Sequence, residues 1–281
     1  LFRSRKMMVY VGANDGMLHA FDADSSTTGL IEAFAYVPGA VYDGLADLAD
    51  PAYGGGDPKK QAFVDGPLSY SDAQLADADS TTNDWRSILV GSLGAGAQGI
   101  FALDVTDPDP PNSAAGASDV VLWEFTDASG DDDGLDGRDM GYSFGKPAIV
   151  RIDDSGGGVD GSAWVVLVGN GYENRSTQGE SAAACGDAHS GSPTNCTVSQ
   201  TGNAVLYVLN LAGEDAQRIR GHMDTREGSE DAPDRAAGGD SAARCSGESN
   251  NGDPTENRSN GLGEVSTLDE DRDLVADRAY A

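Results

Sequence analysis

Basic residues are scarce in this chain. Lys and Arg together number 18 against 47 Asp and Glu, and the formal net charge is −29. Nucleic acid is excluded as a partner, because phosphate binding needs a clustered basic surface, and anionic membrane surfaces are excluded for the same reason. Such acidity is typical of a salt-adapted extracytoplasmic surface, where ionic screening reduces self-repulsion. The alternative is an acidic protein that binds cations loosely.

Long hydrophobic runs and clusters of reactive side chains are also lacking. No stretch approaches the length of a membrane-spanning helix. No Cys-x-x-Cys or Cys/His cluster is present, which argues against zinc. No Gly-x-Ser-x-Gly elbow or P-loop occurs, and we expect no enzyme. With 38 Gly and 7% aromatic residues, the composition favours many turns and short strands.

Cysteine is limited to three residues, Cys185, Cys196 and Cys245. The first two flank a loop rich in Gly, Ser and Asn, and a disulfide between them would fit an oxidising compartment. Two free thiols in a flexible loop are the alternative. Cys245 is left without a partner in this sequence.

What the chain does contain is a repeat. Three segments each combine a strand, a glycine-bearing turn and a second strand that ends near Asp or Asn: residues 8–22, residues 87–105, and residues 164–172 continued by 203–211. In the first, Asn14-Asp15-Gly16 between two apolar runs is a strong hairpin signal. Repeats some 75–80 residues apart predict an all-β fold, a partial β-propeller built of blades. A plain β-sandwich is the alternative.

Long polar insertions separate the predicted strands. The largest covers about 214–259, is almost wholly polar, and is predicted to be a surface insertion within a blade. A shorter acidic turn at 131–136 is interpreted as a solvated loop rather than a cation site. The sequence begins and ends in strand-like stretches, so we expect residues 1–281 to be a fragment of a longer protein, with one partial propeller domain.

The end of the chain carries a second pattern, the spacing of carboxylates over residues 269–277. Asp269, Asp271, Asp273 and Asp277 occupy positions one, three, five and nine of a loop, and Val275 at position seven can offer its carbonyl. Alternating side chains of a curled loop converge on one point, and an oxygen-rich set of this kind is typical of Ca²⁺ sites. The alternative is an acidic turn that shows the pattern by chance in an Asp-rich protein.

This predicted calcium loop differs from an EF-hand. Leu274 stands at position six, where the EF-hand turn has Gly, and Tyr280 at position twelve, where it has a bidentate Glu. Apolar residues at 274–275 and 279–280 read as a strand that follows directly, so we expect the loop to connect two strands.

Several blocks resemble a known family. The C-terminal β-propeller of the PilY/PilC family, the type IV pilus tip-associated adhesins, is similar to four blocks of this chain in order: 9–22, 98–108, 140–150 and 168–172. The loop over 269–277 lies where that family carries its calcium site. The resemblance implies an exported protein at the pilus tip or cell surface, passing through the periplasm or outer membrane. It implies roles in pilus biogenesis, twitching motility and adhesion, with minor pilins and host or surface ligands as partners.

The rival interpretation is a pyrroloquinoline-quinone dehydrogenase, whose propeller repeats read like residues 9–22. Such an enzyme needs a catalytic Asp, polar groups that hold the cofactor and a stacking Trp. We expect Trp85, Trp123 and Trp164 to be core residues, since they lie on or beside strand-like runs. His19, in an apolar strand, is likewise expected to be packed rather than to bind a metal.

Overall fold

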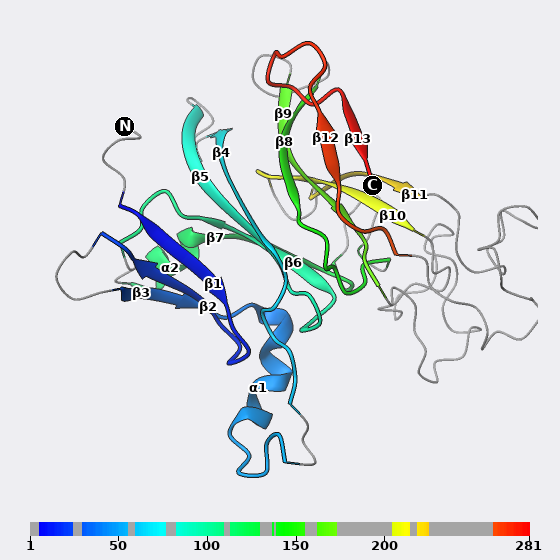
Figure 1. The fold of residues 1–281 in the computed structure, drawn as a ribbon. Helices are drawn as coiled ribbons and strands as arrows, with labels where there is room; N and C mark the ends of the chain where they lie inside the picture. Colours follow the sequence, from blue (N-terminus) through cyan, green and yellow to red (C-terminus); the bar gives the residue numbers. More distant parts are fainter. Residues whose placement is uncertain are drawn as a thin grey trace, which may run out of the picture.

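The computed structural model arranges short antiparallel sheets side by side, with loops at their ends (Figure 1). The all-β prediction is confirmed, and within the described residues only two seven-residue α-helices and one 3₁₀ turn interrupt it, all in the connections. No helix in the part of the chain that is described has the length and apolar character of a membrane crossing. The structure describes residues 6–24, 30–55, 60–76, 83–109, 113–129, 137, 139–154, 162–172, 204–213, 218–224 and 261–281.

Three sheets form successive blades. Blade 1 has the order β1-β2-β3, blade 2 the order β4-β5-β6-β7 and blade 3 the order β8-β9-β10-β11, so neighbours in sequence pair as neighbours in space. The strands of blade 1 are β1 (Met8–Gly12), β2 (Leu18–Asp22) and β3 (Ile31–Tyr36). Those of blade 2 are β4 (Leu68–Ala76), β5 (Asn83–Ser92), β6 (Gly99–Asp104) and β7 (Val121–Thr126). Those of blade 3 are β8 (Ala148–Asp153), β9 (Ser162–Gly169), β10 (Val205–Asn210) and β11 (Ile219–Asp224).

The remaining elements connect or follow these blades. A 3₁₀ turn η2 (Gly39–Val41) and helix α1 (Tyr42–Leu48) join blade 1 to blade 2. Helix α2 (Ala114–Val120) precedes β7, and Ser113 caps it by accepting a hydrogen bond from the Gly116 N–H. A two-stranded hairpin, β12 (Ser266–Leu268) and β13 (Arg278–Tyr280), ends the chain.

The blades repeat in detail as well as in outline. Pairing shifts register at Ala20/Phe21 between β2 and β3, at Ala102/Leu103 between β6 and β7, and at Val208/Leu209 between β10 and β11. A β-bulge of this kind bends the strand and increases its twist. Because the shift recurs at the same place, β2, β6 and β10 are structural counterparts, and so are β1, β5 and β9.

Short lead-ins before β4, β8 and β12 cross the preceding blade near the ends of β1, β5 and β9, respectively. The Phe63 N–H donates to Asn14 Oδ1 at 3.2 Å, and the Leu262 N–H donates to Asn170 Oδ1 at 3.0 Å. The backbones approach so closely that a Cβ on Gly12 would lie 2.2 Å from the Val64 oxygen. Glycine is required at such a crossing because any side chain would collide with backbone.

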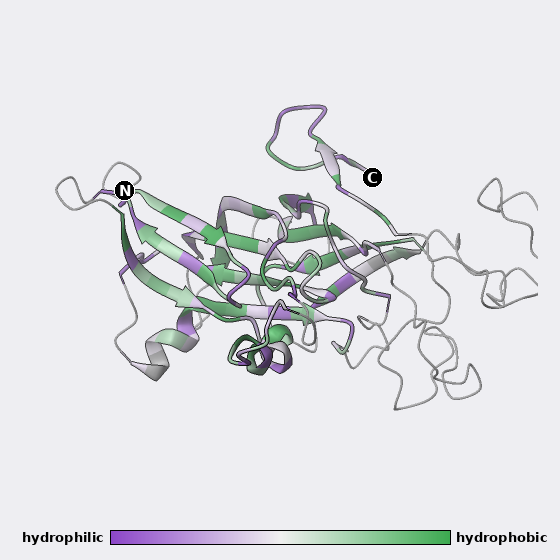
Figure 2. Ribbon diagram, turned by 60° about the horizontal axis from the view of Figure 1, so that its bottom comes forward, coloured by the Kyte–Doolittle hydropathy of each residue, from purple (hydrophilic) through white to green (hydrophobic). Residues whose placement is uncertain are grey.

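Apolar cores lie between the blades. One cluster joins β2 and the segment around Val41 to the face of blade 2 that carries Leu89 and Phe101. A second cluster joins the opposite face of blade 2 to blade 3, with Phe125 and Tyr207 in edge-to-face contact at 5.1 Å. Figure 2 shows the hydrophobic colouring concentrated on the strands of the sheets, as such cores require.

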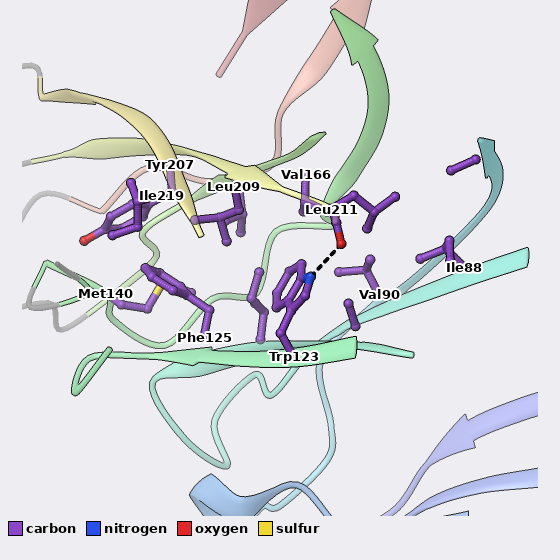
Figure 3. Close-up of a cluster of buried hydrophobic side chains, with 14 of the residues drawn as sticks. Ile88, Val90, Trp123, Phe125, Met140, Val166, Tyr207, Leu209, Leu211 and Ile219 are labelled. Carbon is purple, nitrogen blue, oxygen red and sulfur yellow. Dashed lines mark hydrogen bonds between the residues drawn. The ribbon is translucent and has the colours of Figure 1, made fainter. Parts of the chain in front are cut away.

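The tryptophans divide between core and surface. Trp123 is buried between blades 2 and 3, and its indole Nε1–H donates to the Leu211 carbonyl at 3.1 Å (Figure 3). Trp164 packs at the edge of the same cluster. Trp85 is 50% exposed, so the prediction that it is a core residue was wrong. It lies near the start of β5, beyond the reach of the inter-blade core, and contacts Trp164 edge-on at 6.2 Å.

The polar insertion expected at about 214–259 is only partly described. Within it, residues 219–224 form β11, which pairs with β10 and completes blade 3. An outermost strand needs little apolar surface, and the sequence of β11 is accordingly mixed and polar. The strand could therefore not be predicted from its sequence. The cysteines Cys185, Cys196 and Cys245 and the acidic turn at 131–136 lie outside the described residues.

His19 lies between two carboxylates on the side of blade 1 that faces away from blade 2. Its Nδ1 is 2.6 Å from Glu32 Oε1 on β3, and its Nε2 is 2.9 Å from Asp15 Oδ2 in the β1–β2 turn. The ring stacks on Phe21 at a centroid distance of 5.9 Å. The hydrogen bond to Glu32 raises the pKa of His19 above its ordinary 6.5, against partial burial that lowers it, and Asp15 adds to the rise.

A raised folded-state pKa means that proton uptake by His19 favours the folded protein. This stabilisation is fully present below pH 6.5 and is lost as the pH rises through the folded-state pKa. In the unsubstituted protein, we expect the free energy of unfolding to fall by about 1 kcal/mol or less as the pH rises through the folded-state pKa of His19. His19→Gln should abolish this fall. Denaturant titrations at several pH values measure it. Identical pH profiles for the two proteins would contradict this account.

Trp123→Phe should lower the free energy of unfolding by about 2–3 kcal/mol, because it leaves the buried Leu211 carbonyl unpaired and opens a cavity between two blades. Trp85→Phe is the matched control, with an expected loss below about 1 kcal/mol at its exposed site. Urea denaturation compares the two variants, and equal losses would show that the Trp123 hydrogen bond contributes nothing.

Candidate metal site in the β12–β13 loop

The candidate site is the loop over 269–277, which connects β12 to β13. Leu268 pairs with Arg278 at its base, and the Asp277 N–H donates to the Leu268 carbonyl at 2.9 Å. The loop therefore joins two antiparallel strands, as predicted, with the second strand beginning at Arg278. The apolar pair at 274–275 lies within the loop instead of in a strand.

Two contacts hold the hairpin against blade 3. The lead-in residue Val265 is buried and packs with Val165, Leu167 and Leu206. In the loop itself, the Ala276 N–H donates to the Arg151 carbonyl of β8 at 2.7 Å. Figure 1 shows the hairpin beside β8 and β9, with its loop at the far end from the lead-in. β12 pairs antiparallel with β13, as β4 does with β5 and β8 with β9, and a lead-in precedes each of these three pairs.

Asp269, Asp271 and Asp273 converge at the centre of the loop. Each offers a carboxylate oxygen, and these three oxygens lie within 4.8 Å of one another. Asp269 accepts hydrogen bonds from the Arg272 N–H at 2.6 Å and, with its other oxygen, from the Leu274 N–H at 3.0 Å. The alternating Asp spacing thus brings these three carboxylates together in the folded loop.

Bonds of the same type, each from the N–H two residues further along the chain, hold the other two carboxylates. Asp271 accepts from the Asp273 N–H at 3.2 Å, and Asp273 accepts from the Val275 N–H at 2.8 Å. Backbone N–H groups partly offset the repulsion among the carboxylates, and each carboxylate keeps further lone pairs for another partner. The loop is curled by these bonds even before any cation is considered.

The tight curl requires an unusual backbone. Arg272 and Leu274 have φ values of 67° and 69°, in the left-handed region that glycine adopts most readily. Leu274 occupies the position at which an EF-hand has Gly. The conformation is the same kind of sharp turn, although the residue is not the expected one.

Asp277 lies outside the group of three converging carboxylates. Asp277 Oδ2 accepts a hydrogen bond from the Glu270 N–H at 2.7 Å, so its carboxylate ties the end of the loop to its beginning. An ion pair between Glu270 and Arg278, 2.9 Å from carboxylate oxygen to Nε, reinforces the same closure. Sequence reasoning missed this pair and the contact of Ala276 with Arg151, because neither has a local pattern.

The donor set determines what the loop can hold. It consists of carboxylate and carbonyl oxygens, which suit hard cations such as Ca²⁺. It contains no His or Cys, the ligands that favour zinc. The loop is also exposed, so a cation could enter without rearrangement of the blades.

Comparison with known proteins identifies the class. Residues 2–194 match the PilY1 beta-propeller domain family. This chain belongs to that family.

Individual relatives agree with this assignment. The chain is 35% identical over 272 residues to the type IV pilus biogenesis factor PilY1 homolog of Xylella fastidiosa strain Temecula1, covering 97% of this chain and 13% of the relative. It is 40% identical over 173 residues to type IV pilus biogenesis factor PilY1 of Pseudomonas aeruginosa strain PAO1, covering 61% of this chain and 12% of that protein. The chain thus spans only a small part of these relatives.

A solved structure is also similar. The crystal structure of the P. aeruginosa PilY1 C-terminal domain superimposes with a TM-score of 0.53 at 29% identity, and the match covers 99% of this chain and 36% of that one. The propeller prediction and the family resemblance are both confirmed by these findings.

The backbone at Leu274 gives a test of the loop. Leu274→Ile should destabilise the hairpin by about 1–2 kcal/mol, because a β-branched residue is poorly accommodated at positive φ. Leu274→Gly should be tolerated, since the side chain is 79% exposed and contributes little packing. Hydrogen exchange of the β12–β13 amides compares the variants. Equal exchange in both would contradict the positive φ assigned to this position.

Proposed function

We propose that this chain is the calcium-binding propeller part of an exported type IV pilus assembly and tip-associated protein. The convergence of Asp269, Asp271 and Asp273 in a loop between two strands supports the calcium site. Family membership and the names of the relatives, type IV pilus biogenesis factors, support the role in pili. Within this proposal the ligands are the side chains of those three residues and of Asp277, with the carbonyl of Val275.

Calcium would act on the geometry of the hairpin. Bound Ca²⁺ supplies the positive charge that three converging carboxylates lack, and it would fix the curl of the loop. The Ala276 N–H that contacts Arg151 belongs to the same loop. Occupancy of the site would therefore hold the β12–β13 hairpin against blade 3. We propose that the balance of pilus extension and retraction responds to calcium through this connection.

Location, partners and the absence of catalysis complete the proposal. The pilus tip and cell surface, minor pilins, and host or surface ligands are proposed on the family assignment. Adaptation of the acidic surface to salt stays a prediction from composition. No observation favours the quinoprotein alternative: Trp123 is packed between two blades and its N–H is bonded to a carbonyl, so it is not free to stack on a cofactor.

Calorimetric titration with CaCl₂ tests the site. The unsubstituted protein should bind, and a hundredfold excess over the dissociation constant should stabilise it by about 2.7 kcal/mol. Asp271→Ala and Asp277→Ala should each weaken binding on the order of tenfold or more, because each removes a charged ligand. In the full-length protein, Asp277→Ala should alter pilus number or twitching without abolishing secretion.

Two controls sharpen this test. Asp119→Ala removes an exposed carboxylate in α2, far from the loop in sequence, and should leave the affinity unchanged. MgCl₂ should bind poorly, because Mg²⁺ requires a smaller and stricter octahedron. If all three Asp variants bind Ca²⁺ equally, or if the unsubstituted protein does not bind it, the loop is only an acidic turn.

A further inference from the structure

Two arginines lie beside the carboxylates of the β12–β13 loop. Residues 269–278 contain five carboxylates and two guanidinium groups, those of Arg272 and Arg278. Basic residues are scarce in this chain, 18 among 281, so two of them next to the proposed calcium ligands call for an explanation. A guanidinium keeps its positive charge at any ordinary pH, and that charge opposes the approach of a cation. The loop therefore contains groups that lower calcium affinity as well as groups that raise it.

Arg278 is held at the base of the loop. It is the first residue of β13 and follows Asp277 directly. Its backbone pairs with Leu268 on β12, and its side-chain Nε lies 2.9 Å from Glu270 Oε1. The positive charge of Arg278 is thus fixed next to the carboxylate that ties the two ends of the loop together.

Glu270 takes part in the loop through two separate groups. Its backbone N–H donates to Asp277 Oδ2 at 2.7 Å, whereas its side chain pairs with Arg278. The backbone bond joins the two ends of the loop without using the Glu270 side chain. The Glu270 carboxylate also lies outside the group of three converging carboxylates. The contact left for this side chain is the one that offsets the charge of Arg278.

The ion pair acts on the site mainly through charge. The side chains of Arg278 and Glu270 are 59% and 45% exposed, and exposed pairs contribute little to folding stability. A unit charge within about 10 Å of a divalent ion, in contrast, changes its dissociation constant roughly threefold to tenfold at low ionic strength. Electrostatics therefore outweighs the contribution of the pair to loop closure.

We propose that Arg278 limits the calcium affinity of this loop and that Glu270, by pairing with Arg278, sets the size of that limit. Neither residue is a ligand in this scheme. The inference rests on the calcium site proposed above and deepens it, since it assigns the residues that tune the site. A loop that switches between states has to release its ion, and a fixed neighbouring cation favours release.

The two residues should have opposite effects when each is neutralised. Arg278→Gln leaves the negative charge of Glu270 beside the site, so calcium should bind more tightly. Glu270→Gln leaves the positive charge of Arg278 uncompensated, so calcium should bind more weakly. If the pair served only to close the loop, both substitutions would weaken binding. The sign of the change in Arg278→Gln therefore separates the two accounts.

Calorimetric titration with CaCl₂ at low ionic strength tests this in the full-length protein that contains the chain. The event to follow is the one that Asp271→Ala removes. Arg278→Gln should lower its dissociation constant about threefold to tenfold, and Glu270→Gln should raise it by a similar factor. The double variant should lie within about twofold of the unsubstituted protein, because the two charge changes cancel.

Three controls accompany the titration. Lys146→Gln removes an exposed positive charge ahead of β8, whereas the loop contacts β8 near its end, and should leave the affinity unchanged. In about 1 M NaCl, where the screening length is about 3 Å, the differences among the variants should fall below about twofold. A purely structural role would not show this salt dependence. Hydrogen exchange of the β12–β13 amides without calcium should be the same in every variant.

The outcomes separate this proposal from the one on which it rests. Weaker binding by Arg278→Gln, unchanged affinity in both single variants, or loss of amide protection in Arg278→Gln would overturn the tuning role alone. Absence of the Asp271-dependent binding event in the unsubstituted protein would overturn the calcium site and the tuning role together.

Discussion

Burial of sheets on both faces is the constraint on which this structure depends. A sheet in a sandwich needs one apolar face, but a blade in a propeller has a neighbour on each side, and both faces must be apolar. The central strands β5 and β9 meet this requirement, and their side chains fill three successive clusters. Polar residues are consequently displaced to the strand ends and connections, where the large excess of acidic residues can stay in water.

The lead-ins convert separate sheets into a connected series. Each one crosses the preceding blade and is bonded there, through Asn14 in one case and Asn170 in another. Asn170 is fully buried, and its side-chain oxygen also accepts from the Val205 N–H, so one amide links a loop, a strand and the next lead-in. Satisfied buried amides of this kind fix relative position, since any other placement would leave polar groups unpaired.

The loop over 269–277 shows how a local motif depends on its support. Its curl comes from hydrogen bonds between carboxylates and nearby backbone N–H groups, which the Asp spacing itself provides. Its position comes from elsewhere: the packing of Val265 and the bond from Ala276 to Arg151 set the hairpin beside blade 3. Neighbouring residues therefore supply the chemical groups of the site, whereas contacts with distant residues decide where the site lies.

The sequence by itself determined the features that arise from neighbouring residues: the Asn14–Gly16 hairpin, the paired strands of the repeat, and the convergence of Asp269, Asp271 and Asp273. Tertiary structure decided the features that depend on distant contacts. The strand β11 was not predicted, because it lies in a polar stretch and forms by pairing with β10. The burial predicted for Trp85 was wrong, because its exposure depends on how far the next blade extends. The role of Asp277 in binding Glu270, and the contact of the loop with β8, likewise follow from chain closure and packing, for which sequence spacing carries no signal.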